Sequence, residues 1–92
     1  MNNTPQITDI DTVIKIYYRY PEIGTSEIIQ IFKKHSKATI SRLKNLARKQ
    51  MIENNIYTYG MYKINTECAY KAWGIDVEDL EKRRNKLQKL GL

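Results

Sequence analysis

Apolar positions recur at helical spacing through most of the chain. In the longest such segment, one stripe of a helical wheel carries or borders the apolar side chains Ile40, Leu43, Leu46, Ala47 and Met51. Ser36 supplies a hydroxyl suited to an N-cap, and neither glycine nor proline interrupts the residues that follow. The pattern predicts a helix over residues 36–50, with its apolar side against a core.

The residues before this helix predict an amphipathic scaffold helix. Apolar side chains recur at helical spacing over residues 9–20. Pro21 ends that helix, because the residue before a proline avoids the α conformation. The short connector that follows fits at most a minimal strand segment through Ile23.

A second helix is predicted over residues 26–33, capped by Thr25 or Ser26. It is apolar on nearly two sides. A connector of two residues, 34–35, separates it from the helix over 36–50. Two helices joined this tightly predict a helix-turn-helix arrangement.

The apolar period changes from helical to alternating after Gln50. Residues 56–59 and 61–64 are rich in β-branched and aromatic side chains, and Gly60 separates them. They predict two antiparallel strands joined by a tight turn. The predicted fold is therefore mainly α with a small β-hairpin.

Two more helices are predicted after the hairpin. One covers residues 66–73, is capped by Asn65 or by its own first residue, and ends at Gly74 in a left-handed conformation. Asp76 caps a last helix over 77–90. Acidic side chains gather in the first half of this last helix and basic ones in its second half, as the helix dipole favours.

Ninety-two residues suffice for one domain with a modest core. We expect a flexible N-terminus over 1–7, a domain over 8–65 and a C-terminal helical extension over 66–92. The net charge of +6 and the pI near 9.5 favour an anionic partner. No acidic residue lies between Ile28 and Ile52, so the positive charge gathers on and just before the longest predicted helix.

The side of that helix opposite its apolar stripe carries Ala38, Arg42, Asn45 and Lys49, spaced i, i+4, i+7 and i+11. Small, guanidinium and amide side chains on one helix face suit a DNA major groove. A basic helix face that is simply solvated is the alternative that this pattern leaves open.

The order helix, helix, basic helix, hairpin, with the segment SKATISRLKNLARKQMIE leading into strand residues, resembles the winged helix-turn-helix superfamily. Bacterial regulators of that type often carry a segment S-x-x-T-I/V-S-R-x-K/L-x-L, then a basic or glycine turn, then L/M-I-E. The matching residues here are Ser36, Thr39, Ile40, Ser41, Arg42, Leu46, Met51, Ile52 and Glu53. The resemblance covers about residues 8–65, and the short hairpin loop and the C-terminal extension depart from it.

The resemblance implies that the helix over 36–50 lies in the major groove of duplex DNA, in a transcription regulator and more specifically a repressor. The residues expected to contact bases are Ala38, Ser41, Arg42 and Asn45. Arginine suits guanine, asparagine suits adenine and a small methyl group suits thymine. The residues expected to contact the phosphate backbone are Lys33, Lys34, Lys37, Lys44, Arg48, Lys49 and Lys63.

Two arrangements are open for the last predicted helix. Arg84 interrupts its apolar seam, so no clean coiled coil is expected. The helix can fold back on its own domain or pair with that of a second chain. A homodimer is favoured, because regulators of this type read two half-sites with a two-fold protein. The residues expected at that interface are Trp73, Val77, Leu80, Leu87 and Leu90.

Catalysis is not expected from this chain. His35 is its one histidine, Cys68 fits a small buried apolar residue, and no metal-ligand or phosphate-loop spacing occurs. We expect no metal or cofactor, and nothing in the chain points to a small-molecule ligand. A cytoplasmic location is expected, because no apolar run is long enough to span a bilayer and the N-terminus lacks a signal pattern. The abundance of Ile, Lys, Asn and Tyr indicates A/T-rich codons and so a bacterial, phage or plasmid source.

Two other functions are compatible with these patterns. Tyr57, Tyr59 and Tyr62, beside Lys63, suit single-stranded or structure-directed nucleic-acid binding, as in an accessory protein of plasmid or phage replication. Against this, tyrosines on a two-stranded sheet more often bury one face against the core. In the other alternative, the basic helix contacts an acidic protein and the domain is a protein–protein docking module.

Overall fold

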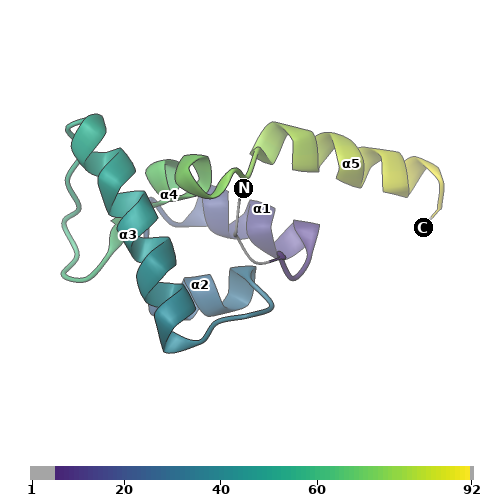
Figure 1. The fold of residues 1–92 in the computed structure, drawn as a ribbon. Coiled ribbons are helices and arrows are strands. Elements are labelled where there is room, and N and C mark those ends of the chain that lie inside the picture. The colour runs from purple at the N-terminus through teal and green to yellow at the C-terminus, as the bar shows by residue number, and fades with distance from the viewer. Residues whose placement is uncertain (1–5, 92) are drawn as a thin grey trace.

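The computed structural model describes residues 6–91, which fold as helices packed around two very short strands (Figure 1). The elements in chain order are α1 (Ile10–Arg19), β1 (Glu22–Ile23), α2 (Thr25–Ile31), α3 (Lys37–Glu53), β2 (Ile64–Asn65), α4 (Thr66–Trp73) and α5 (Val77–Lys89). The predicted class, mainly helical with a small antiparallel β element, is confirmed at this level. Within the described residues, no helix combines the length and the apolar character needed to cross a membrane.

The three helices of the second half begin where the sequence predicts. The hydroxyl of Ser36 accepts the N–H of Thr39 (3.2 Å) at the start of α3, which continues to Glu53, past its predicted end. The bounds of α4 are those predicted, with the side chain of Asn65 as its cap and Gly74 in the left-handed region (φ 74°). α5 ends one residue before its predicted end. Local capping signals therefore determine these boundaries.

The start of α2 differs from the prediction. Gly24 is its N-cap, so neither Thr25 nor Ser26 caps the helix. The N–H of Gly24 donates to the carboxylate of Glu27 (2.7 Å), which is the half of a capping box that needs no hydroxyl. The helix also ends early, because Phe32 leaves it in an extended conformation and is fully buried. The connector to α3 is therefore longer than the two predicted residues.

The predicted hairpin is wrong. Residues 56–63 form a loop, and β2 pairs instead with β1, antiparallel, with Glu22 opposite Asn65 and Ile23 opposite Ile64. A two-stranded hairpin whose faces are both exposed is marginally stable. Pairing with β1 puts Ile23 and Ile64 side by side in the core, where both are fully buried. Burial of Ile64 thus favours the long-range pairing over the local one.

The N-terminus was predicted to be flexible over residues 1–7. Residues 1–5 of this segment lie outside the part of the chain that the structure describes. The N–H of Lys33 donates to the carbonyl oxygen of Gln6 (3.0 Å). Ile7 pairs with Phe32 in an isolated antiparallel bridge. Gln6 and Ile7 are therefore attached to the connector between α2 and α3.

The core lies where α1, α2, α3 and α4 meet. α4 packs along α3, and the indole N–H of its Trp73 donates to the carbonyl oxygen of Leu43 (2.9 Å). The hydroxyl of Tyr70 donates to the carbonyl oxygen of Val13 in α1 (2.7 Å). Phe32 meets the edge of the Trp73 ring at a centroid distance of 5.2 Å. α4 thus connects α3 to the rest of the molecule.

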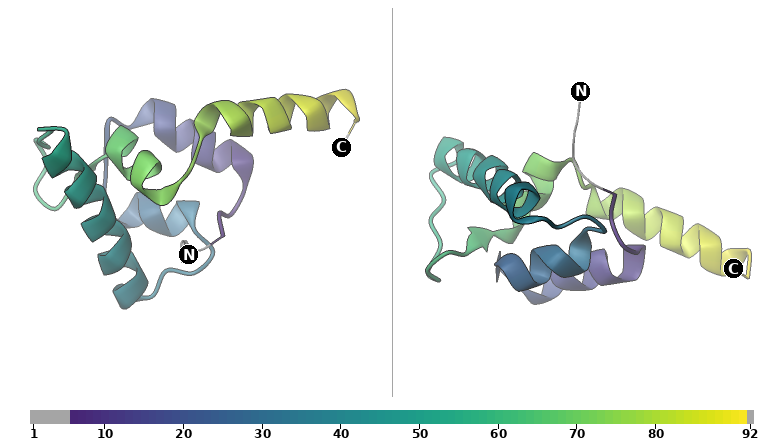
Figure 2. Two further views of the ribbon diagram at one scale, coloured as in Figure 1. Left: turned by 45° about the horizontal axis from the view of Figure 1, so that its top comes forward. Right: turned by 60° about the horizontal axis from the view of Figure 1, so that its bottom comes forward.

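α5 is only partly supported by the core. Val77 and Leu80, near its start, are buried, and the Arg84 guanidinium lies 3.8 Å from the Asp11 carboxylate of α1. Beyond this point the helix extends away from the other elements, as the two further views also show (Figure 2). The described residues accordingly form an elongated body of 41 × 25 × 25 Å.

Candidate nucleic-acid interface

α3 presents an apolar side to the core and a polar side to solvent. Leu43, Ala47 and Met51 are buried, whereas Ile40 is half-buried and Leu46 is partly exposed at the edge of the stripe. The four residues expected to contact bases are all exposed on the opposite side: Ala38, Ser41, Arg42 and Asn45. The helical wheel therefore predicted which way each of these side chains points.

The basic residues assigned to phosphate contacts differ in how exposed they are. Four of them are exposed around the start and the outer side of α3: Lys33, Lys34, Lys37 and Lys49. Arg48 is half-buried on α3. The other two, Lys44 and Lys63, are partly enclosed and contact residues of α2.

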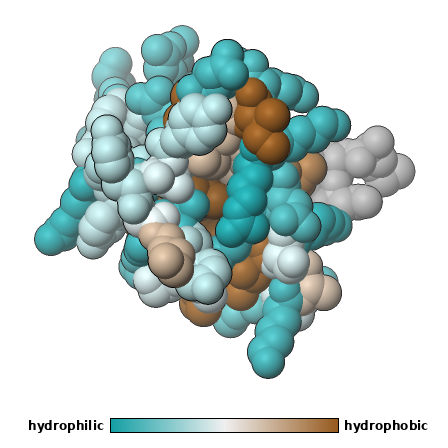
Figure 3. All heavy atoms as spheres, turned by 90° about the vertical axis from the view of Figure 1, so that its left-hand side faces the viewer, coloured by the Kyte–Doolittle hydropathy of each residue, from teal (hydrophilic) through white to brown (hydrophobic). Residues whose placement is uncertain are grey.

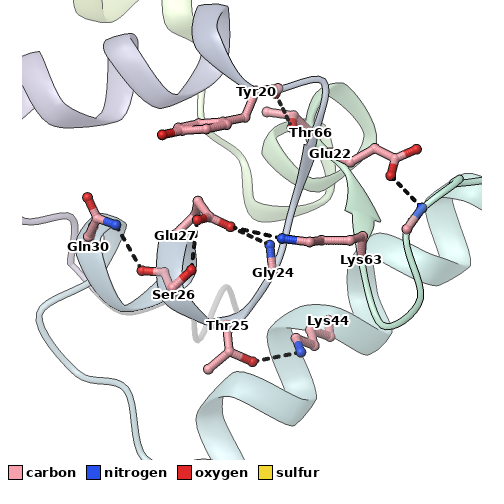
Figure 4. Close-up of polar contacts among 11 residues, drawn as sticks. Tyr20, Glu22, Gly24, Thr25, Ser26, Glu27, Gln30, Lys44, Lys63 and Thr66 are labelled. Carbon is pink, nitrogen blue, oxygen red and sulfur yellow. Dashed lines mark hydrogen bonds and ion pairs between the residues drawn. The ribbon is translucent and has the colours of Figure 1, made fainter.

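Lys44 and Lys63 join three elements near the start of α2 (Figure 4). The ammonium of Lys44 donates to the Thr25 hydroxyl (2.8 Å), and that of Lys63 lies 3.7 Å from the Glu27 carboxylate. Burial, together with the nearby charges of Arg48 and Lys63, lowers the pKa of Lys44. These contacts fix α3 and the end of the loop 56–63 against α2.

Glu27 is the acidic group at the centre of these contacts. Its side chain is only 13% exposed and accepts the Gly24 N–H (2.7 Å) and the Ser26 hydroxyl (2.7 Å). Burial raises the pKa of Glu27, but these two hydrogen bonds and the charge of Lys63 outweigh it, so the pKa is lowered. Glu27 is therefore an ionised internal partner rather than a negative charge on the outer surface.

The loop 56–63 brings aromatic side chains to the surface beside this basic region. Tyr57 is 84% exposed, Tyr59 is fully exposed, and Tyr62 is 75% exposed. Figure 3 shows this end of the molecule, where strongly hydrophilic and weakly polar side chains gather around a few apolar ones. The sequence predicted these tyrosines in the strands of a hairpin. No sequence signal indicated that they would lie in an exposed loop instead.

The loop is held in place by one carboxylate. Glu22 of β1 accepts the N–H groups of Tyr59 (2.6 Å) and Gly60 (2.8 Å). A Cβ atom at position 60 would lie 2.5 Å from Cγ of Lys63 and 3.2 Å from the Glu22 carboxylate, so a side chain there would displace both neighbours. Gly60 is thus the turn residue that the sequence indicated, but in a loop closed by Glu22.

The residues assigned to a dimer interface are split by the fold. Trp73, Val77 and Leu80 are buried in the protein's own core, so they do not face a second chain in this structure. Leu87 is 42% exposed and Leu90 is 69% exposed. The outward-facing apolar surface of α5 is therefore confined to its last turns.

Outside α3 the described surface is mixed, because Lys82, Arg83, Lys86 and Lys89 are exposed on the second half of α5. A hollow of about 1090 Å³ lies between α1, α4 and the start of α5, and its rim carries the acidic side chains of Glu67, Asp76 and Glu78. Among residues 6–91, no three His, Cys, Asp or Glu side chains lie close enough to hold a metal ion. Cys68 is buried, and burial raises the pKa of its thiol.

Comparisons with known proteins add nothing to these observations. A scan against protein-family models, a search of curated proteins and a search of solved structures each found no match. The function is therefore inferred from the side chains and contacts described above.

Proposed function

We propose that this protein binds duplex DNA through the outer side of α3, as a homodimeric transcription regulator of the winged helix-turn-helix type in which the loop 56–63 takes the place of the wing hairpin. The observation that carries the proposal is the division of α3 into two sides. Leu43, Ala47 and Met51 fix one side in the core, while Ala38, Ser41, Arg42 and Asn45 are exposed on the other. A helix oriented so firmly can present its outer side chains to base edges without first being ordered.

The dimensions and side chains of α3 suit a major groove. An α-helix is about 10–12 Å wide with its side chains, and the major groove of B-DNA is about 12 Å wide. Arg42 is assigned to a guanine and Asn45 to an adenine, and each such bidentate pair contributes roughly 1–3 kcal/mol of discrimination. Ala38 offers a methyl group to a thymine. In this geometry α2 crosses the DNA backbone and α3 enters the groove.

Phosphate contacts come from the exposed lysines that surround this side of α3. They are Lys33, Lys34, Lys37 and Lys49. Arg48, Lys44 and Lys63 reinforce them at the edge of the surface, where Lys44 and Lys63 also hold α2. Affinity falls as the salt concentration rises, and each neutralised phosphate is expected to make the slope of log affinity against log salt concentration steeper by about 0.9.

The second half of α5 is assigned to dimerisation. Leu87 and Leu90 are exposed there, beyond the support of α1. A two-fold dimer would then read two half-sites, separated by about one helical turn of DNA or a multiple of it.

Selection from a pool of random duplexes, followed by titration of the selected site at several salt concentrations, tests the proposal. Arg42→Ala is expected to relax the preference at one base position, by about 10-fold or more. Lys34→Ala is expected to weaken binding to all duplexes alike and to reduce the salt slope by about one contact. Lys15→Ala, which removes an exposed lysine from α1, is the matched control and should change neither property.

Three results would contradict the proposal. Binding to no duplex below micromolar concentration at physiological salt would point to an acidic protein partner instead. If Arg42→Ala and Lys34→Ala lose the same affinity on every duplex, the assignment of Arg42 to base contacts is wrong. If the protein binds the selected site as a stable monomer, the assignment of α5 to dimerisation is wrong.

A further inference from the structure

Three tyrosine rings of the loop 56–63 are almost fully exposed, unlike most other large rings of the chain. Tyr70 and Trp73 are buried, and Tyr17 packs against Tyr70 with its ring centroid 5.0 Å away. Tyr57, Tyr59 and Tyr62 instead place most of their surface in solvent, together with Met61, which is 81% exposed. Apolar side chains that are exposed together in one short segment often mark an interaction site, whereas single exposed ones are common on any protein surface.

This loop is anchored rather than loose. Glu22 accepts two of its backbone N–H groups, and the Thr58 hydroxyl donates to the carbonyl oxygen of Lys63 (3.3 Å) across its base. Tyr62 adopts a left-handed conformation (φ 64°), which a tyrosine rarely takes without support from its surroundings. Because these contacts exist before any ligand binds, a ligand that contacts the rings does not lose binding free energy to ordering the loop.

Cationic side chains lie at one end of the loop that carries these rings, where Lys63 is 42% exposed. Lys63 ends the loop, and its charge and that of Arg48 act on Lys44 of α3. Two acidic groups contact the loop: Glu22 accepts two of its N–H groups, and the Glu27 carboxylate lies 3.7 Å from the Lys63 ammonium. Aromatic rings interleaved with cations fit the bases and phosphates of a nucleic acid. Bases inside a duplex offer no free face to a ring, so the bases that this loop can stack are unpaired ones.

We propose that Tyr57, Tyr59 and Tyr62 form a second binding surface, which stacks unpaired bases of a strand that continues from the duplex held by α3. This inference rests on the proposed function and narrows its substrate to duplex DNA with adjoining single-stranded nucleotides. α3 binds the paired part, and the loop binds the bases where pairing ends. Glu22 is a positioning residue for this surface, because it holds the loop without offering a ring.

The test compares three DNA probes by fluorescence anisotropy at one salt concentration. They are a blunt duplex, the same duplex with a short single-stranded extension at either end, and the single strand alone. The extension is expected to tighten wild-type binding about fivefold or more. Tyr59→Ser is expected to abolish that gain and to leave affinity for the blunt duplex unchanged. Glu22→Ala, which keeps every ring, should reduce the gain without abolishing it.

The matched control is Tyr18→Ser. Tyr18 is also exposed, but it lies on α1 and its hydroxyl donates to Glu81 of α5, outside the loop 56–63. Circular dichroism spectra of all variants establish that each is folded. Tyr18→Ser should retain the full gain from the extension.

Each other outcome decides against one of the two proposals. No gain from the extension, or equal losses for Tyr59→Ser on blunt and extended duplexes, overturns the stacking surface and leaves duplex binding by α3 intact. Failure of the wild type to bind the blunt duplex overturns the proposed function instead. In that case, single-strand binding that Tyr59→Ser weakens would still support the stacking surface, and its absence would overturn both.

Discussion

α3 and α5 are both amphipathic and both rich in lysine and arginine, but the fold supports them differently. α4 packs along the apolar side of α3, and Trp73 donates to a carbonyl oxygen of that helix. α5 rests on α1 only through its first half, and Leu87 and Leu90 stay exposed. The same kind of pattern thus yields a clamped helix in one place and a projecting one in the other.

The difference shows that an amphipathic helix needs a surface to pack against, but that its pattern does not tell which surface this is. For α3 the partner lies within the chain, so its outer side has one orientation. For the last turns of α5, the described residues supply no such partner, and the proposed one is a second copy of the protein. Changes that disturb the clamp should therefore be large, and changes in the projecting turns should be small unless two chains meet.

The largest effect is expected from removing the clamp. Trp73→Ala should lower the free energy of unfolding by about 3–5 kcal/mol, because it empties a buried site beside Phe32 and leaves the Leu43 carbonyl without the indole donor. Urea unfolding followed by circular dichroism measures this. Trp73→Phe keeps much of the ring volume and should lose less. A loss below about 1 kcal/mol for Trp73→Ala would mean that α3 is held by other contacts.

A medium effect is expected at Glu27, which holds the start of α2 and the end of the loop 56–63 together. Glu27→Gln should lower the free energy of unfolding by about 1 kcal/mol at neutral pH, because neutral hydrogen bonds replace charge-assisted ones. Since the folded-state pKa of Glu27 lies below its ordinary value of 4.5, the contribution is present above that value and is lost as pH falls through the lowered pKa. The two proteins should therefore become equally stable in acid.

Unfolding curves at neutral pH and near pH 3 measure this difference. Glu53→Gln, which changes an exposed carboxylate at the end of α3, is the control and should stay within about 0.5 kcal/mol of wild type. A gap between Glu27→Gln and wild type that is the same at both pH values would contradict the charge-assisted role.

The smallest effect on the single chain is expected in the projecting turns. The double change Leu87→Gln and Leu90→Gln should alter the free energy of unfolding by less than about 0.5 kcal/mol at low protein concentration, because neither side chain belongs to the buried core. Sedimentation equilibrium should nevertheless detect weaker self-association. A large loss of stability in the isolated chain would show that α5 folds against its own domain along its whole length.

Much of the secondary structure could be predicted because it depends on neighbours in the sequence. Ser36, Asn65 and Asp76 cap their helices with their own side chains, as the sequence indicates. The exposure of Ala38, Ser41, Arg42 and Asn45 follows from helical geometry once the apolar side of α3 is known. The cap of α2 was missed because Glu27, not a hydroxyl, satisfies the start of that helix.

The amino-acid sequence by itself determined where the long helices lie and which of their sides are apolar, since both depend on interactions within a few residues. Only the tertiary structure decided that Ile64 pairs with Ile23 rather than with a strand across Gly60, and that α5 packs on the core only near its start, through Val77 and Leu80. These choices compare contacts between segments distant in the chain. The local pattern of residues 56–64 suits a strand in either pairing, and only the burial available beside β1 distinguishes the two.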